Sequence, residues 1–157
     1  VTWVSGDPLV SQYLYHLGPE PLVDDFDGHY LYTRARGRRT AVKNFIMDGR
    51  IVVGVGNIYA SEALFRSGIR PTRAAGRIAL ERYSLLVTAI QTVLGEAIAA
   101  GGTTLRDYSR VTGEPGYFEP ALKVYERQGQ PCEVCGDLIN RKVIGQRASY
   151  YCPSCQH

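Results

Sequence analysis

All four cysteines of the 157-residue chain lie within its last 26 residues. They form two pairs of equal internal spacing, Cys132 with Cys135 and Cys152 with Cys155, and 16 residues separate the pairs. Two such turns face each other when a β-hairpin joins them, and four thiolates then meet in the tetrahedral arrangement that Zn²⁺ prefers. Because four protein ligands leave no open position for a substrate, the spacing predicts one structural Zn²⁺ ion.

Two disulfides of a secreted protein, or a redox-active pair, are the alternative interpretation of these cysteines. Residues 1–7 contain neither the basic nor the apolar region of a secretory signal, which argues against the disulfides. A unit this small cannot bury enough apolar surface to fold alone, so the metal would supply the missing free energy. We therefore expect chelation to unfold the residues beyond about Ala121 and to leave the helical part folded.

A second candidate site lies where a helix is predicted to start. Gly54 and Gly56 precede Asn57, which we expect to cap a helix that continues to Arg66. Glycines allow close approach of a ligand to the backbone, and a helix start presents free N–H groups and a positive dipole end. A DNA phosphate would fit there, but spacing alone favours the alternative, an ordinary N-cap that faces water.

A basic run at residues 34–39 is open to two interpretations as well. It contains four arginines, and Lys43 follows it one turn into the next predicted helix. Charge runs are usually solvated faces, but a neighbouring anion site favours phosphate contact. The net charge of +3 permits a nucleic-acid partner without arguing for one.

The elements that position these residues are mainly helical. Apolar periodicity and helix-ending residues predict helices at 9–17, 40–48, 57–66 and 79–99, with a glycine-rich turn at 49–56 and a glycine stop at 101–102. Strands at 137–144 and 147–151, joined by a turn at Gly145 and Gln146, predict the zinc hairpin. No apolar run approaches the roughly 20 residues that span a bilayer, so we expect no membrane partner and a cytoplasmic protein.

Longer runs of residues resemble the formamidopyrimidine-DNA glycosylase family and follow its order from about Leu17 to His157. These runs are residues 43–48, 53–65, 101–107, 116–118, 124–125 and 146–152. The resemblance implies a mainly α fold with three parts: a lead-in helix and linker (1–27), a helix-two-turn-helix DNA-binding domain (28–120) and a β-hairpin zinc finger with four cysteine ligands (121–157). It also implies double-stranded, damaged DNA as partner, and a bacterial-type location at the nucleoid.

The same resemblance implies roles for individual residues. Asn57 and Arg147 would bind the phosphates that flank an extruded nucleotide, and Lys43 and Tyr125 would add weaker backbone contacts. Arg147 at the hairpin tip suits two-point phosphate binding, but a solvated turn arginine is the alternative. Residues 106–118 correspond to the loop that closes over a flipped base in the family, or else form a disordered connector.

The catalytic residues of the family have no counterpart in this sequence. The resemblance implies an N-terminal Pro-Glu, with proline as nucleophile, on a β-sandwich that also carries a catalytic lysine, whereas this sequence opens at Val1. We therefore expect no base excision, and at most feeble cleavage at abasic sites, from a zinc-containing DNA-binding protein. Two alternatives remain open. The chain could be a fragment or split half of an active glycosylase, with a partner polypeptide over the face of the absent sandwich, or a zinc-ribbon module that docks another protein.

Overall fold

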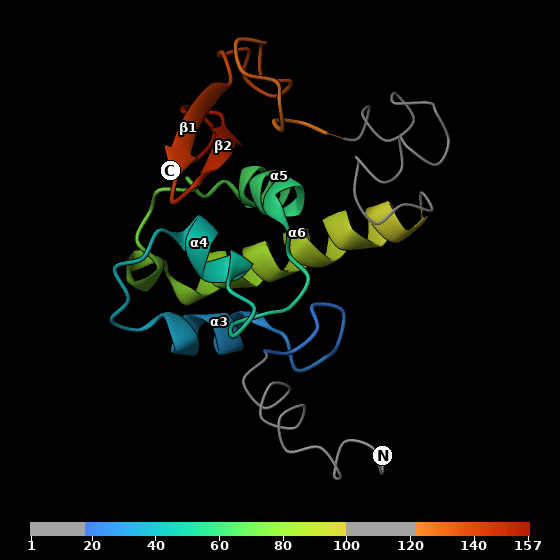
Figure 1. Cartoon of the computed structure of the whole chain (residues 1–157), viewed down its shortest axis with the longest axis vertical. Coiled ribbons are helices and arrows are strands. Elements are labelled where there is room, and N and C mark those ends of the chain that lie inside the picture. Colours follow the sequence, from blue (N-terminus) through green and yellow to red (C-terminus); the bar gives the residue numbers. More distant parts are fainter. Residues whose placement is uncertain (1–17, 100–121) are drawn as a thin grey trace.

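The computed structural model describes residues 18–99 and 122–157. Its elements are α3 (Gly28–Ala35), α4 (Val42–Met47), α5 (Asn57–Ser67), the 3-10 turn η1 (Ala75–Arg77), α6 (Leu80–Ala99), β1 (Asn140–Ile144) and β2 (Arg147–Tyr151) (Figure 1). The expected mainly helical architecture with one antiparallel hairpin is confirmed. The predicted helix at 9–17, the glycine stop at 101–102 and the lesion-loop segment 106–118 lie outside the described residues, and the three-part division stays a prediction.

Helix α6 is the central element, with α5 packed on one side and α3 on the other (Figure 1). Its apolar residues recur every three or four positions, so that one continuous face is buried. The hydroxyl of Tyr83, fully buried on this face, donates a 2.6 Å hydrogen bond to the carbonyl of Ala75 and so fixes η1 against α6. Burial raises the pKa of Tyr83 well above its usual range, which keeps the phenol neutral.

Helix α3 is an element that the apolar pattern did not predict separately. Asp27 caps it, because its side chain accepts a 2.8 Å hydrogen bond from the backbone N–H of Tyr30. Gly28 lets the helix approach α6 closely, since a Cβ at this position would lie 2.6 Å from the Cα of Ser84. The cap and the close contact together hold the basic run beside the core.

Helix α5 ends as predicted but begins differently. Gly68, with a φ of 74°, closes it in the left-handed conformation that favours glycine. The prediction that Asn57 is the N-cap is wrong: Gly56 is the N-cap, and Asn57 is the first residue of the helix. The physical reason is that the Asn57 side chain is bonded to the zinc hairpin instead of to its own helix.

The hairpin pairs Asn140 with Tyr151 at its open end and Ile144 with Arg147 beside the turn. Strand β2 turns Ser149, Tyr150 and Tyr151 inward, whereas four of the five residues of β1 are exposed. A second apolar cluster forms beneath β2, where Phe65 of α5 packs with residues of the zinc unit. In the described ranges, no helix is long and apolar enough to cross a membrane.

Candidate metal centre and nucleic-acid interface

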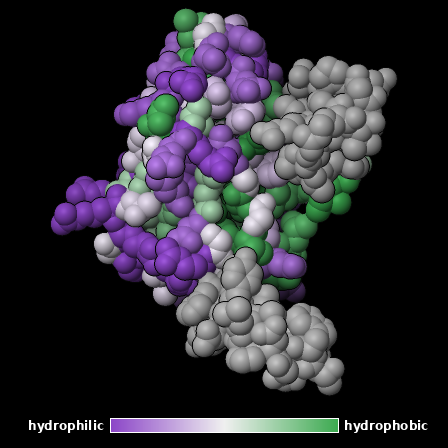
Figure 2. All heavy atoms as spheres, viewed as in Figure 1, coloured by the Kyte–Doolittle hydropathy of each residue, from purple (hydrophilic) through white to green (hydrophobic). Residues whose placement is uncertain are grey.

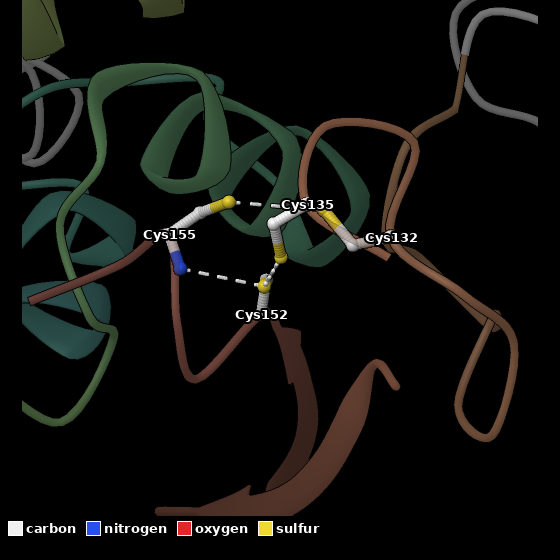
Figure 3. Close-up of side chains that lie close together, drawn as sticks. All are labelled: Cys132, Cys135, Cys152 and Cys155. Atoms are coloured by element: carbon white, nitrogen blue, oxygen red, sulfur yellow. Dashed lines mark hydrogen bonds between the residues drawn. The ribbon is translucent and has the colours of Figure 1, made fainter. Parts of the chain in front are cut away.

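The sulfur atoms of the four cysteines converge at one end of the hairpin (Figure 3). All four lie within 4.8 Å of one another, with 3.8 Å between the sulfurs of Cys132 and Cys155 and 3.4 Å between those of Cys135 and Cys152. A tetrahedral site with Zn–S bonds of about 2.3 Å requires S···S separations of about 3.8 Å. The sulfurs therefore fit one zinc ion and are too far apart for disulfide bonds, so the predicted four-cysteine zinc site is confirmed.

Backbone N–H groups prepare these sulfurs for metal binding. The N–H groups of Val134 and Asp137 point at the sulfurs of Cys132 and Cys135, at 3.4 and 3.5 Å. Burial raises the pKa of Cys132, but backbone N–H donors outweigh it and lower that pKa to about 7. Burial and hydrogen bonds to the neighbouring sulfurs raise the pKa of Cys155 instead. Because Zn²⁺ binds thiolates, metal binding at this site would release protons.

The zinc unit is fastened to the end of α5 by polar contacts. Gln156 is fully buried; its amide donates to the carbonyl of Ile69 at 2.9 Å and accepts from the N–H of Cys152 at 2.7 Å. The Arg70 guanidinium donates to the carbonyl of Pro153 at 2.6 Å. Since Cys152 is a metal ligand, these bonds tie the geometry of the metal site directly to the helical core.

A second set of contacts joins α4, α5 and β2, and we call it the polar junction: Lys43, Asn57 and Ala148. The Lys43 ammonium donates to the side-chain oxygen of Asn57 at 2.5 Å and to the carbonyl of Ala148 at 3.1 Å. The Asn57 amide donates to the same carbonyl at 3.0 Å. The orientation of the Asn57 side chain is therefore fixed from two sides at the start of α5.

Lys43 itself is fully buried, which the sequence did not suggest. Burial, followed by the positive charge of Arg147, lowers its pKa from 10.5 to about 8. A direct contact between Lys43 and a phosphate stays a prediction, because in this structure its ammonium lies beneath the surface. In this structure Lys43 instead fixes the orientation of the Asn57 side chain.

Tyr125 and Arg147 complete the neighbourhood of the junction. Tyr125 packs edge-to-face on Tyr150 with 5.0 Å between ring centres; burial raises its pKa, while a hydrogen bond with Asn57 partly offsets that effect. Arg147 is exposed, one residue before Ala148, and its charge acts on both Lys43 and Tyr125. The structure thus brings together all four residues predicted to contact DNA. Beside them lies an open groove of about 410 Å³, lined by Asn44, Met47, Asp48, Ile144, Gly145, Gln146 and Arg147.

Glu62 is a residue of this region that sequence reasoning missed. Its buried carboxylate accepts hydrogen bonds from three consecutive backbone N–H groups, those of Lys123, Val124 and Tyr125, at 2.7, 2.9 and 2.9 Å. Three converging N–H donors form a small anion-binding concavity, here filled by the protein's own carboxylate. The partners are more than 60 residues away along the chain, so no local signal marks the contact.

Comparison with known sequences matches this architecture. Residues 17–109 match the family described as formamidopyrimidine-DNA glycosylase H2TH domain, and residues 129–157 match the zinc finger found in FPG and IleRS. The chain is 59% identical over 156 residues to a formamidopyrimidine-DNA glycosylase of Syntrophotalea carbinolica and 56% identical over 157 residues to one of Nitrosococcus oceani. These matches cover 99% and 100% of this chain, but the chain spans only 58% of the length of each relative.

Solved structures give the same result. MutM (Fpg) of Thermus thermophilus is 40% identical, with a TM-score of 0.81, and the match covers 91% of this chain and 55% of that one. Lactococcus lactis Fpg, in complex with DNA that contains an abasic site, is 31% identical with a TM-score of 0.83, covering 95% of this chain and 55% of that one. With its helix-two-turn-helix domain and its four-cysteine zinc finger, the chain belongs to the formamidopyrimidine-DNA glycosylase family.

Proposed function

We propose that this chain grips double-stranded DNA by its phosphates and serves as the DNA-holding part of a base-excision-repair glycosylase. The observation that carries the proposal is the polar junction, where Lys43 and the Ala148 carbonyl hold the Asn57 amide in one orientation. Residues that contact phosphate position a duplex without reading its sequence. A fixed amide beside an exposed arginine suits that task, because little side-chain freedom is then lost on binding.

The proposed contacts follow from the chemistry of the two surface groups. Asn57 is the first residue of α5, so a phosphate near its amide also meets the positive end of the helix dipole. The Arg147 guanidinium can donate two parallel hydrogen bonds to one phosphate. We propose Tyr125 as a weaker contact at the edge of the site and Lys43 as the residue that positions Asn57. Association with the bacterial nucleoid would follow from such binding.

A gel-shift experiment tests this function directly. The full chain is titrated against an undamaged duplex and a duplex with an abasic analogue, each at two salt concentrations. We expect binding that weakens as salt increases, since phosphate contacts release counter-ions. Asn57→Ala and Arg147→Ala should each weaken binding by about 1–3 kcal/mol. Absence of duplex binding at the lower salt concentration would exclude the proposal.

We further propose that the chain alone does not excise bases. Glycosidic cleavage by this family needs an activated amine beside the sugar C1′, and the buried amine of Lys43 is hydrogen-bonded to Asn57 and Ala148. Borohydride trapping on abasic and 8-oxoguanine duplexes checks this, with no cross-link expected. Efficient trapping would instead favour an active enzyme.

A split or longer glycosylase is the second candidate, because the chain spans 58% of its relatives' length. The helical domain exposes Leu22, Val23, Leu85 and Ile98, between 41% and 63% accessible, and a further domain or partner polypeptide would cover such side chains. Figure 2 shows apolar surface beside the grey segments on one side of the molecule. Base excision that appears only when a polypeptide matching the first part of a relative is added would establish this candidate.

A protein-interaction module is favoured by one observation, the exposed apolar residues Val134, Leu138 and Val143 of the zinc unit. Capture of a protein partner through these side chains would be insensitive to salt and to Arg147→Ala. DNA binding of the kind proposed above would be sensitive to both.

A further inference from the structure

Two chain segments far apart in the sequence lie side by side at the edge of the helical domain. An antiparallel bridge joins Ala41 to Ala74, and backbone hydrogen bonds of 2.7 to 2.9 Å connect residues 38–42 with 73–76. The close approach requires Gly76, because a Cβ there would lie 2.8 Å from the carbonyl oxygen of Arg38. This pairing fixes the relative positions of the residues that both segments carry.

Four arginines lie on the paired segments or directly after them, and we call them the arginine ridge: Arg38, Arg39, Arg73 and Arg77. All four are exposed. Among residues 18–99 and 122–157, none of them has a carboxylate within ion-pair distance. The chain as a whole carries a net charge of only +3, so an unpaired cluster of this size is a local feature and not a consequence of composition.

The other arginines of the basic run have structural roles. Arg36 lies over the ring of Tyr32 at 3.7 Å and donates to the carbonyls of Gly76 and Ile78, both at 3.2 Å, so it joins the end of α3 to η1. Arg34 donates to the hydroxyl of Tyr30 at 3.0 Å. Arg34 and Arg36 are thus engaged within the fold, and the ridge combines the second half of the run with Arg73 and Arg77.

One member of the ridge, Arg38, is preorganised, and its charge reaches the groove next to the polar junction. Arg38 donates to the carbonyl of Arg34 at 2.9 Å and lies 5.7 Å from the ring centre of Phe45. Its charge also reaches Asp48, which lines the same groove as Arg147. Figure 2 shows hydrophilic side chains gathered over the turn between α3 and α4 and over the zinc hairpin, away from the apolar side. Arg38 of the ridge therefore acts electrostatically on the groove that Arg147 lines.

We infer that the arginine ridge is a second phosphate-binding surface, which contacts the backbone of the same duplex outside the polar junction. The inference rests on the DNA-binding function proposed above and extends it to residues that would not touch the lesion. Duplex DNA fits because it presents a regular row of anions, and guanidinium groups bind phosphate oxygens with matched hydrogen bonds. Such contacts carry no sequence or damage information, so the ridge would contribute affinity without selectivity.

The test compares two variants of the full chain that each lose two positive charges. R39Q/R77Q removes two ridge side chains that have no hydrogen-bond partner in the described part of the chain, so the fold should be retained. R141Q/K142Q, on the exposed strand β1, is the control for net charge. Dissociation constants are measured between about 50 and 200 mM salt, on undamaged and abasic-analogue duplexes.

For R39Q/R77Q we expect the slope of log K against log salt to fall by about 2 in magnitude, since each lost phosphate contact removes about 0.9. The ratio of affinities for the two duplexes should stay unchanged. If R39Q/R77Q leaves the salt slope unchanged, or if R141Q/K142Q changes it equally, the inference that the ridge binds phosphate is overturned. The proposed function would stay intact. A wild-type chain that binds neither duplex would overturn both.

Discussion

Lys43 donates a 2.5 Å hydrogen bond to the side-chain oxygen of Asn57, so a buried cation in α4 sets the orientation of an amide at the start of α5. Removing the ammonium leaves the Asn57 oxygen without this donor and lets the amide rotate. We predict that Lys43→Met lowers affinity for duplex DNA by about tenfold or more, comparable to the effect of Asn57→Ala. Titration by fluorescence anisotropy measures this, with Lys142→Met on β1 as the exposed control. Equal affinities of Lys43→Met and Lys142→Met would contradict the positioning role.

Burial also gives Lys43 a distinct pH signature. Its pKa in the folded protein is about 8, against 10.5 in an unfolded chain. Between these values the unfolded state holds more protons, so the contribution of Lys43 to stability rises with pH through that window and is least favourable below pH 8. We predict that the stability of the wild type, relative to Lys43→Met, improves by about 1–3 kcal/mol from pH 8 to 10.5. Urea unfolding at a series of pH values and fixed free zinc checks this; parallel curves for the two proteins would refute it.

Zinc removal should loosen the contact between the zinc unit and the end of α5 as well as the hairpin itself. Chelation frees the loop that carries Cys152 and thereby loosens Gln156, whose amide is bonded to Ile69 just beyond α5. We predict fast amide hydrogen exchange throughout residues 122–157, with the buried face of α6 still protected. DNA binding should be lost at the same time, because Arg147 and Ala148 no longer have fixed positions. Restoring zinc is the control, and protection of the hairpin that survives chelation would disprove this account.

Glu62 is buried, and its hydrogen bonds to three backbone N–H groups should stabilise the fold. Glu62→Gln keeps the shape but puts an amide donor against backbone N–H groups that need an acceptor. We predict a loss of about 2 kcal/mol in the free energy of unfolding. Glu96→Gln, which removes an exposed partner of Arg66, should cost less than about 1 kcal/mol. Equal losses in chemical denaturation would show that the converging bonds contribute little.

Local patterns predicted much of this molecule. The cysteine spacing specified the metal site, and the predicted strand at 147–151 coincides with β2. The predicted helix at 79–99 differs from α6 by one residue at its start. These features depend on residues close together in sequence, where periodicity and turn chemistry are informative.

Features that depend on distant residues were not predictable in this way. The burial of Lys43 depends on β2, which lies about 100 residues later in the chain. The displaced N-cap of α5 has the same origin, because the Asn57 side chain bonds to that strand. The arginine ridge depends on the pairing of residues 38–42 with 73–76, and no sequence pattern in either segment predicts that pairing. In each case the outcome depends on contacts between residues far apart in the sequence, which local patterns do not encode.

The acceptor shared by Lys43 and Asn57 is the main-chain oxygen of Ala148. A backbone atom is present whatever side chain occupies the position, so no substitution at 148 can delete this acceptor by itself. Only a change in the path of the strand, such as an insertion in the hairpin turn or a slip in register, would move it. The link between the zinc finger and the helical domain is therefore tolerant of sequence drift at this position and sensitive to changes in hairpin length.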